Sequence, residues 1–426
     1  MINKPKGTYD INGINGKKIL ELENMFKNMM LLYNYEYIRT PIFESSNLFH
    51  RGVGETTDIV SKETYDFKDR GNREMTLRPE GTASVVRSYI ENKIYGEAKT
   101  PTKYWYYGPM YRYERPQSGR NREFYQFGVE VFESNDPAID AEVISIPVNI
   151  YKLLGLKDVK VKINSLGDTE SRNNYKEVLL KHFKGHIDDL CGDCKERYKK
   201  NPLRILDCKV DSNHNALKTA PSILDYLNDE SKNHFELLKK YLTSLSVEYI
   251  VDSSIVRGLD YYTHTVFEVE AKLASTDKMS ILCAGGRYDG LVSAIGGPNT
   301  PGVGFALGME RLMNILEEEK IELDFDNEID CYVIPLSANE KEEALKLVSH
   351  LRMNAFKVDT DFLSRNVKSN FKQADRLNTR FIILIGEEEM KTNIYTIKNN
   401  ITKEEYRIKQ KDIIDFLDEQ DNIHDH

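Results

Sequence analysis

Residues 257–262 read Arg-Gly-Leu-Asp-Tyr-Tyr, and residues 263–269 continue as Thr-His-Thr-Val-Phe-Glu-Val. The second segment alternates between two kinds of side chain, which predicts a strand with two different faces. The first segment places a guanidinium, a carboxylate and two phenols at the start of that strand, and a guanidinium fork matches carboxylate or phosphate. By itself the run fits a small charged ligand, but it also fits a strand-end ion pair beside two core tyrosines. Other polar clusters decide between these interpretations.

The composition is that of an ordinary globular protein. The chain has 426 residues, of which 40% are hydrophobic and 30% charged, enough for two to four domains. It has no apolar run of about 18 residues, which predicts no membrane span. The N-terminus lacks an apolar signal core, so we expect a cytoplasmic protein. The net charge of −9 argues against a general nucleic-acid coat but leaves room for a local basic patch.

The segments upstream of residue 257 predict strand-rich blocks around a helical insertion. Residues 168–250 are rich in Lys, Asn and Asp, with apolar residues at helical spacing. The block before them ends in an alternating strand at Val159–Asn164, and the block after them begins at Tyr249–Val251. Nearer the N-terminus, Lys17–Tyr33 predicts an amphipathic helix. Tyr37–Phe43 is extended and interrupted by a proline, which favours an edge or an interface.

A charged stretch at Glu317–Glu328 marks a second boundary. Beyond it, Cys331–Leu336 predicts a strand, and apolar stripes at 344–351 and 371–377 predict helices. Phe381–Gly386 is a continuous apolar run typical of a strand buried on both faces. This alternation predicts a small α/β domain of about 100 residues.

The segment Thr76–Thr82 predicts a strand-to-helix junction. Pro79 biases the preceding residue to an extended conformation, and Gly81 allows the backbone to turn. A carboxylate at Glu80 could there accept hydrogen bonds from an amino group. The alternative, favoured by spacing alone, is that Thr82 caps the helix while Glu80 lies in solvent.

The segment Tyr111–Glu130 predicts a strand, a loop and a second strand. The loop contains Pro, Ser and Gly for turning and carries three arginines, Arg115, Arg120 and Arg122. Clustered arginines in an acidic protein suit a polyphosphate or a nucleic-acid backbone. The second strand has a ring, an amide and a carboxylate on one face, from Phe124, Gln126 and Glu130.

Two glycine-rich segments form a third cluster, Gly285–Gly290 and Gly302–Leu312. Glycines allow a backbone or a ligand to approach closely, and Glu310-Arg311 then opens or continues a helix. The third glycine is misplaced for a dinucleotide-binding fingerprint, and no Gly-Lys-Ser or Gly-Lys-Thr phosphate loop is present. If ATP binds, we expect arginines and a sheet surface to hold it.

The cysteines raise the question of a metal. Cys191 and Cys194 form a Cys-x-x-Cys pair and Cys208 follows, whereas a structural zinc site needs four ligands. His186 or His214 could be the fourth ligand, but the spacing fits no standard finger. We therefore expect reduced structural thiols and no structural zinc. Five cysteines are also too few for a disulfide scaffold.

Together these clusters resemble the histidyl-tRNA synthetases, a family of class II aminoacyl-tRNA synthetases, over essentially the whole chain. Three segments resemble the motifs that mark the class: Phe43–Asp58, a helix–strand element at the dimer interface; Tyr111–Glu114 with Phe124; and Gly304–Arg311. Two more, Arg257–Tyr262 and Gly285–Gly290, resemble the histidine-specific motifs.

The resemblance implies an α+β fold. The expected catalytic domain, residues 1–325, has an antiparallel sheet and a helical insertion at about 168–250, and an α/β anticodon-binding domain follows at 328–426. It implies histidine–tRNA ligase activity, in which histidine and ATP give histidyl-adenylate and pyrophosphate, and the histidyl group then passes to the 3′ end of tRNA(His). ATP is then a substrate with Mg²⁺ on its phosphates, and the protein is a cytoplasmic homodimer.

The resemblance also implies roles for individual residues. The catalytic arginines would be Arg257, Arg112 and Arg311, with Arg112 on the α-phosphate and Arg311 on the γ-phosphate of ATP. Phe124 would stack on adenine, and Glu114 would orient the nucleotide. Histidine would be bound by Glu80, Thr82, Gln126, Glu130, Arg257, Tyr261, Tyr262 and Tyr288, with the carboxylate that meets the imidazole left open. The tRNA acceptor end would meet Arg115, Arg120 and Arg122.

Two rival functions compete with this one. A regulatory paralogue would bind histidine and control a phosphoribosyltransferase, but such chains tend to lack the catalytic arginines and the final domain. A class II synthetase for threonine, proline or glycine is opposed by the two tyrosine-bearing motifs. In the final domain, four cations could meet tRNA phosphates or simply form a solvated helix face: Arg365, Lys368, Lys372 and Arg376.

Overall fold

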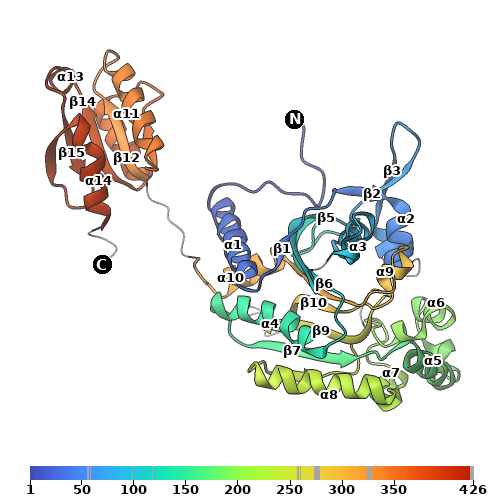
Figure 1. The fold of residues 1–426 in the computed structure, drawn as a ribbon. Coiled ribbons are helices and arrows are strands. Elements are labelled where there is room, and N and C mark those ends of the chain that lie inside the picture. The colour runs from blue at the N-terminus through green and yellow to red at the C-terminus, as the bar shows by residue number, and fades with distance from the viewer. Residues whose placement is uncertain are drawn as a thin grey trace. The chain divides into compact units, whose positions relative to one another are not determined.

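The computed structural model describes residues 1–54, 57, 59–97, 99–117, 119–256, 259, 261–272, 279–323 and 329–422. The chain forms two compact units, Met1–Leu323 and Asp324–His426 (Figure 1). Among the described residues, no helix has the length and apolar character needed to cross a membrane.

An eight-stranded sheet forms the centre of the first unit, in the order β1-β5-β6-β11-β10-β9-β7-β8. The six strands from β5 to β7 pair antiparallel, and the two outer strands pair parallel with their neighbours. This confirms the predicted antiparallel α+β domain. The strands are β1 (Glu36–Tyr37), β5 (Thr102–Tyr111), β6 (Glu123–Phe132), β7 (Val159–Ser165), β8 (Tyr249–Val251), β9 (Thr263–Lys272), β10 (Met279–Arg287) and β11 (Gly302–Gly308).

Four long helices cover one face of this sheet, and the short helix α3 (Thr82–Glu91) packs on part of the other face. Apolar side chains of α1 (Gly13–Leu32), α4 (Pro137–Leu153), α8 (Asp229–Ser244) and α10 (Met309–Glu318) share one core with the sheet. Phe127, Val129 and Val131 of β6 point into this core. Because side chains alternate along a strand, the residues between them point to the opposite face. The predicted N-terminal helix is confirmed, although it begins at Gly13 rather than at Lys17.

A small antiparallel sheet lies beside the large one, in the order β2-β4-β3. Its strands are β2 (Phe43–Ser45), β3 (Tyr65–Lys68) and β4 (Glu74–Leu77). A short helix, α2 (Ser46–Phe49), follows β2, so this segment runs strand then helix, the reverse of the expected order. Four residues separate β4 from the helix α3 (Thr82–Glu91), which places residues 78–81 at a strand-to-helix junction.

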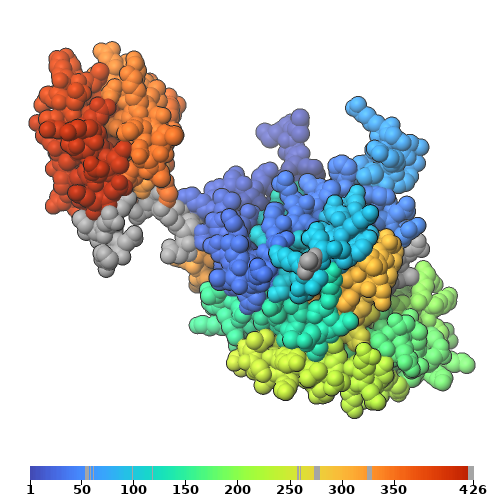
Figure 2. Space-filling model, viewed as in Figure 1, coloured from blue at the N-terminus to red at the C-terminus, as the bar shows by residue number. Residues whose placement is uncertain are grey.

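The region between β7 and β8 is helical and carries a core of its own. It contains α5 (Thr169–Phe183), α6 (Gly192–Lys200), α7 (Asn215–Lys218) and α8. Tyr175, Leu179 and Phe183 of α5 pack there with two of the three cysteines, Cys194 and Cys208. In Figure 2 this region is green to yellow-green and lies along one side of the first unit.

The second unit is an α/β domain, as predicted. Its sheet has the order β13-β12-β14-β15-β16, with β12 parallel to both neighbours and the remaining pairs antiparallel. The strands are β12 (Ile329–Pro335), β13 (Val358–Thr360), β14 (Thr379–Ile385), β15 (Ile394–Asn399) and β16 (Glu405–Lys409). The helices are α11 (Lys341–Met353), α12 (Val367–Arg376), α13 (Glu387–Thr392) and α14 (Ile413–Asn422). Lys368, Lys372 and Arg376 are exposed on α12, whereas Arg365 pairs with Asp361 at 3.1 Å.

Candidate active site

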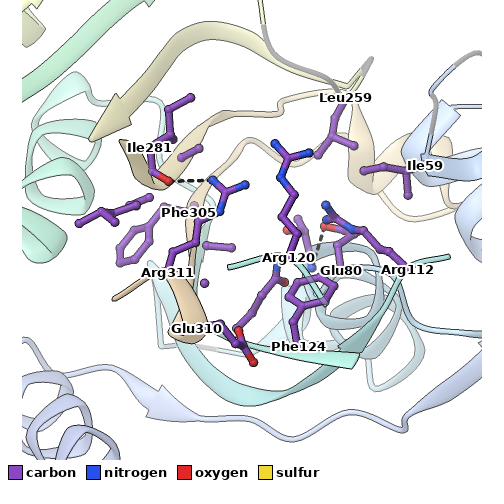
Figure 3. Close-up of a pocket in the computed structure, with 18 of the residues that line it drawn as sticks. Ile59, Glu80, Arg112, Arg120, Phe124, Leu259, Ile281, Phe305, Glu310 and Arg311 are labelled. Atoms are coloured by element: carbon purple, nitrogen blue, oxygen red, sulfur yellow. Dashed lines mark hydrogen bonds between the residues drawn. The ribbon is translucent and has the colours of Figure 1, made fainter. Parts of the chain in front are cut away.

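A pocket of about 360 Å³ opens on the face of the large sheet opposite the four long helices, beside the start of α3. Its walls come from the start of α3, the loop after β5, strands β6, β10 and β11, and the start of α10. Figure 3 shows polar and aromatic side chains from these elements directed into one space. Its volume suits a small-molecule ligand.

The polar face of β6 forms the floor of this pocket. Phe124, Gln126 and Glu130 all line it, as their period-two spacing requires. The side-chain oxygen of Gln126 is buried and has no hydrogen-bond partner within the described structure. A buried polar atom without a partner is costly, so this oxygen is suited to accept a hydrogen bond from a ligand.

Glu130 lies at the deep end of the pocket and is 1% exposed. The hydroxyl of Tyr288 donates to its Oε2 at 2.5 Å, and the hydroxyl of Tyr106 donates to its Oε1 at 3.4 Å. Burial raises the pKa of Glu130 to about 8, because a charged carboxylate is poorly solvated there. The site therefore holds a carboxyl group that can exchange a proton near neutral pH.

Glycines of β11 make room for this buried pair. A Cβ at Gly304 would lie 2.1 Å from Oε2 of Glu130, and a Cβ at Gly302 would lie 2.2 Å from the ring of Tyr288. No side chain fits at either distance. The glycines of this segment therefore allow close packing around an acidic and a phenolic group, and they do not form a phosphate loop.

Glu80 lies at the junction before α3 and is also buried in the pocket wall. It accepts hydrogen bonds from the backbone N–H groups of Thr82 at 3.2 Å and Ala83 at 2.9 Å. The alternative of Thr82 as a cap with Glu80 in solvent is wrong, because Glu80 itself satisfies the first amides of the helix. Burial raises the pKa of Glu80, while those amides and Arg112 oppose the rise.

Three guanidinium groups line the other end of the pocket: those of Arg112, Arg120 and Arg311 (Figure 3). Arg112 donates to the carbonyl of Pro79 at 2.9 Å and lies over the ring of Phe124, 5.2 Å from its centroid. Arg311 donates to the carbonyl of Ile281 at 2.8 Å. Burial and then the charge of Arg120 lower the pKa of Arg311, so these neighbouring cations repel one another.

Two carboxylates accompany these cations. Glu114 lies 3.9 Å from Arg112 and 3.5 Å from Arg120. Glu310, at the start of α10, accepts hydrogen bonds at Oε1 from the backbone N–H of Tyr125 at 2.8 Å and from the hydroxyl of Tyr9. Burial raises the pKa of Glu310. The pocket thus has an acid–phenol end and a cationic end, joined by the floor of β6.

The remaining predicted site residues divide into three groups. Thr82, Tyr261 and Tyr262 line the pocket, and the hydroxyl of Tyr261 lies 3.5 Å from Oε2 of Glu80. Arg115 is exposed outside the pocket, and Arg122 lies over the ring of Tyr113. Arg257 lies outside the described residues.

Sequence reasoning missed two residues that support the site, Tyr106 and Tyr9, and one buried ion pair outside the pocket. Tyr106 is one of several consecutive aromatic residues in β5. Which of them faces the pocket is clear only from the pairing of β5 with β6. Tyr9 reaches Glu310 across 301 positions and carries no local signal. Arg287, inside a motif assigned to histidine, instead forms a buried ion pair with Asp140, and that carboxylate also accepts from Thr265 at 2.7 Å.

An antiparallel sheet with arginines, a stacking ring and buried carboxylates on one face, followed by a separate α/β domain, defines a class II aminoacyl-tRNA synthetase. The family model described as Histidyl-tRNA synthetase matches residues 7–312, and the one described as Anticodon binding domain matches residues 330–420. The chain belongs to the histidyl-tRNA synthetase family.

Individual relatives agree over almost the full length. The histidine–tRNA ligase of Anoxybacillus flavithermus is 50% identical over 413 residues, covering 97% of this chain and 98% of the relative. That of Staphylococcus aureus is 49% identical over 418 residues, covering 98% and 100%. The crystal structure of apo S. aureus histidyl-tRNA synthetase matches with a TM-score of 0.85 and 44% identity, covering 98% of this chain and all of that one.

Proposed function

We propose that this chain is a histidine–tRNA ligase, which forms histidyl-adenylate from histidine and ATP and transfers the histidyl group to the 3′ end of tRNA(His). The observation that carries this proposal is the pocket itself. One continuous space joins a buried carboxyl–phenol pair, Glu130 and Tyr288, to three guanidinium groups beside a stacking ring.

The cationic end suits ATP. The carboxylate of histidine attacks the α-phosphorus, the bond to the β-phosphate oxygen breaks, and pyrophosphate leaves. Charge develops on phosphate oxygens during this step, and fixed cations that neutralise it supply much of the acceleration. We assign Arg112 to the α-phosphate, Arg311 to the γ-phosphate, and Phe124 to stacking on adenine. Glu114, between two arginines, orients the nucleotide.

Arg257 enters this proposal from the family resemblance alone. We place it opposite Arg112, on the α-phosphate from the amino-acid side. Two cations on opposite sides would neutralise the negative charge on the non-bridging α-phosphate oxygens as the new bond forms and the leaving oxygen takes the electron pair of the old one.

The acid–phenol end suits the imidazole of histidine, which offers one donor and one acceptor nitrogen when neutral. We assign the ring to Glu130 with Tyr288 and Tyr262, because a carboxyl group whose pKa is about 8 can share a proton with an imidazole. We assign the ammonium group to Glu80, Thr82 and Gln126, with Tyr261 against Glu80. The backbone amides that hold Glu80 favour its charged form, which is the form an ammonium needs.

In this proposal the arginines of the loop between β5 and β6 bind two ligands, ATP and tRNA. Arg120 lines the pocket beside Glu114, so we assign it to ATP in addition to the tRNA acceptor end. Arg115 is exposed, and Arg122 is half-buried against Tyr113 at the edge of the same loop. We assign these two to tRNA phosphates.

Mg²⁺ fits the same end of the pocket. Hard cations of this kind take phosphate oxygens and one or two carboxylates. Glu310 is a candidate, since the two hydrogen bonds it accepts both go to Oε1. When bound, the ion would neutralise phosphate charge. Glu310 and Glu114 would hold it, while the three arginines position the phosphates.

The remaining parts of the proposal concern partners and location. The second unit binds the anticodon of tRNA(His), and the chain forms a homodimer through the segment Phe43–Asp58. We place the protein in the cytoplasm, because translation takes place there.

The test of the proposed function is charging of a tRNA(His) transcript with labelled histidine, compared with charging of a transcript for another amino acid. Acid-stable label on tRNA(His) alone supports the proposal, and its absence with active ATP and intact tRNA contradicts it.

A further inference from the structure

Three cysteines and one aspartate meet in the helical region between β7 and β8. Cys191, Cys194 and Cys208 each offer a sulfur, Asp211 offers a carboxylate oxygen, and all four atoms lie within 4.8 Å of one another. Cys194 and Cys208 are buried, whereas Cys191 and Asp211 are partly exposed. We propose that these four side chains bind one Zn²⁺ ion in a tetrahedral structural site, which goes beyond the proposed ligase activity.

Two of the distances in this cluster match those that a tetrahedral zinc ion imposes. With Zn–S bonds of about 2.3 Å, two thiolates in a tetrahedron lie about 3.8 Å apart, and a thiolate and a carboxylate oxygen lie about 3.6 Å apart. The sulfurs of Cys191 and Cys208 are 3.7 Å apart, and the sulfur of Cys208 is 3.6 Å from Oδ2 of Asp211. The side chains therefore need little rearrangement to take up the ion.

The chain builds the site from two segments with the same ligand spacing, the start of α6 and the irregular stretch at residues 208–211. Cys191 and Cys194 are spaced Cys-x-x-Cys, and Cys208 and Asp211 repeat that spacing as Cys-x-x-Asp. Ligands three residues apart can point to one centre, as in zinc sites built from Cys-x-x-Cys pairs. The fourth ligand is thus an aspartate in a position equivalent to Cys194. The cluster includes neither His186 nor His214, the residues that the sequence had suggested.

Backbone amides support the ligands from outside the tetrahedron. The N–H of Asp211 donates to the sulfur of Cys208 at 3.4 Å, and the N–H of Cys191 donates to Oδ2 of Asp211 at 3.0 Å. Hydrogen bonds of this kind orient ligands and stabilise their charged forms. Three thiolates and a carboxylate form a ligand set that favours zinc over magnesium or calcium, because soft sulfur ligands select soft metals.

The position of the cluster indicates a structural role. Cys194 and Cys208 belong to the small core of this helical region, together with Leu190, Leu203 and Ile205. The segments that meet there are short: α6 has 9 residues, α7 has 4 residues, and irregular turns connect them. Small cores with short helices gain much from a metal that ties distant segments together. The zinc would join the start of α6 to the turn before α7.

A disulfide and an iron–sulfur cluster are the two alternatives to zinc for these cysteines, and the geometry distinguishes both from a zinc site. A disulfide has sulfurs about 2.05 Å apart, much closer than the 3.7 Å between Cys191 and Cys208. An iron–sulfur cluster would hold its cysteines farther apart, because cluster atoms lie between them. Zinc binding needs no oxidant: the three thiols lose their protons to solvent as the Zn–S bonds form.

The first experiment uses the full-length protein, purified under reducing conditions without chelators. Elemental analysis should find about one zinc ion per chain. Protein stripped of metal and given cobalt chloride should show the intense visible bands of tetrahedral cobalt and a thiolate charge-transfer band in the near ultraviolet. Neither result depends on a variant folding correctly. Reduced protein that contains no zinc and gives no such bands would overturn the proposal, as would a disulfide between Cys191 and Cys208 in fresh protein.

The second experiment compares ligand and control variants. Cys194→Ser and Asp211→Asn should each lower zinc affinity at least about tenfold, and cleavage by a protease should increase between α5 and α7. Cys331→Ala is the matched control, since it removes a buried cysteine from β12 in the other unit. It should keep the full zinc content. Equal zinc content in all three variants would also overturn the assignment of the ligands.

Discussion

The hydroxyl of Tyr288 donates a 2.5 Å hydrogen bond to Glu130, although the two residues are 158 positions apart in the chain. Both are buried, and a backbone glycine at 302 leaves the space that the phenol ring occupies. The bond fixes a carboxyl group at the end of the pocket to which we assign the imidazole of histidine.

The first prediction concerns this phenol. Tyr288→Phe removes a hydrogen bond to Glu130. We expect Glu130 to carry charge when it shares its proton with the imidazole, and losing a hydrogen bond to a charged group costs about 1.5–3 kcal/mol, or roughly 10–150-fold in affinity. We expect the KM for histidine to rise by that factor while the KM for ATP changes little. Tyr89→Phe is the matched control, because Tyr89 is buried and donates to Glu133 at 2.8 Å outside the pocket. Equal effects of the two variants on the KM for histidine would contradict the assignment.

The second prediction concerns pH. Burial raises the pKa of Glu130 from 4.5 to about 8 in the folded protein. Between these values the folded protein holds a proton that the unfolded chain releases, so this group's contribution to stability is complete below pH 4.5 and is lost as the pH rises through about 8. Glutamine does not ionise, so the Glu130→Gln variant should not lose this part of its stability as the pH rises. Scanning calorimetry across this range should show a smaller decline in the unfolding temperature for the variant than for the natural protein. Parallel declines would show that Glu130 is already ionised in the folded protein and would contradict the raised pKa.

The third prediction concerns the cations that face the phosphates. Arg311→Ala, and Arg257→Ala by the family resemblance, should each lower kcat for adenylate formation by about 10²–10³, because each removes charge stabilisation in the transition state. Arg73→Ala is the control, since Arg73 pairs with Asp69 at the exposed turn between β3 and β4. Pre-steady-state adenylate formation measures the effect. Near-normal rates in a folded Arg311 variant would remove this arginine from the mechanism.

The fourth prediction separates two arginines of one loop. Arg115→Ala should weaken transfer to tRNA while leaving amino-acid activation intact, because Arg115 is exposed outside the pocket. Arg120→Ala should weaken activation as well, because Arg120 lines the pocket beside Glu114. The tRNA affinity of the Arg115 variant should also depend less steeply on salt, by about one unit of slope. Equal losses of activation in both variants would assign the whole loop to ATP.

The fifth prediction concerns assembly. Phe43 of β2 is 53% exposed and contacts Phe67, which is 40% exposed, at 6.3 Å between ring centroids. Two exposed aromatic residues beside an edge strand suit a self-complementary interface, and symmetric dimers are the commonest assemblies. Light scattering should give the mass of a dimer for the natural protein and of a monomer for Phe43→Glu. Phe362→Glu, on the second unit, should remain dimeric. A natural protein that is monomeric and fully active would contradict the proposal.

Local patterns in the sequence predicted much of the fold. Alternation along Phe124–Glu130 gave the correct strand and its polar face, and the apolar run at Phe381–Ile385 gave a central strand of the second unit. Both features depend on the chemistry of neighbouring residues, which a sequence shows directly. The family resemblance supplied the order of the domains.

Those local patterns do not predict contacts between segments that are distant in the sequence. Arg287 pairs with Asp140 across 147 positions, and nothing near either residue indicates the other. The sequence gives no local sign that Asp211 meets three cysteines, because carboxylates are common on surfaces and histidines are the more usual partners of cysteines in zinc sites. Glu80 was misjudged from spacing alone, because its burial depends on the pocket that other strands complete.

The central claim is that this pocket activates histidine and no other amino acid. Amino-acid-dependent exchange of labelled pyrophosphate into ATP tests it most directly, with each of the twenty amino acids in turn and without tRNA. We predict strong exchange with histidine, which falls by the factors predicted above in the Tyr288 and Arg311 variants, and background exchange with the other nineteen. Exchange that depends on threonine, proline or glycine would assign the pocket to another synthetase. Histidine binding without any exchange would show a histidine-binding protein that does not catalyse, and would contradict the account.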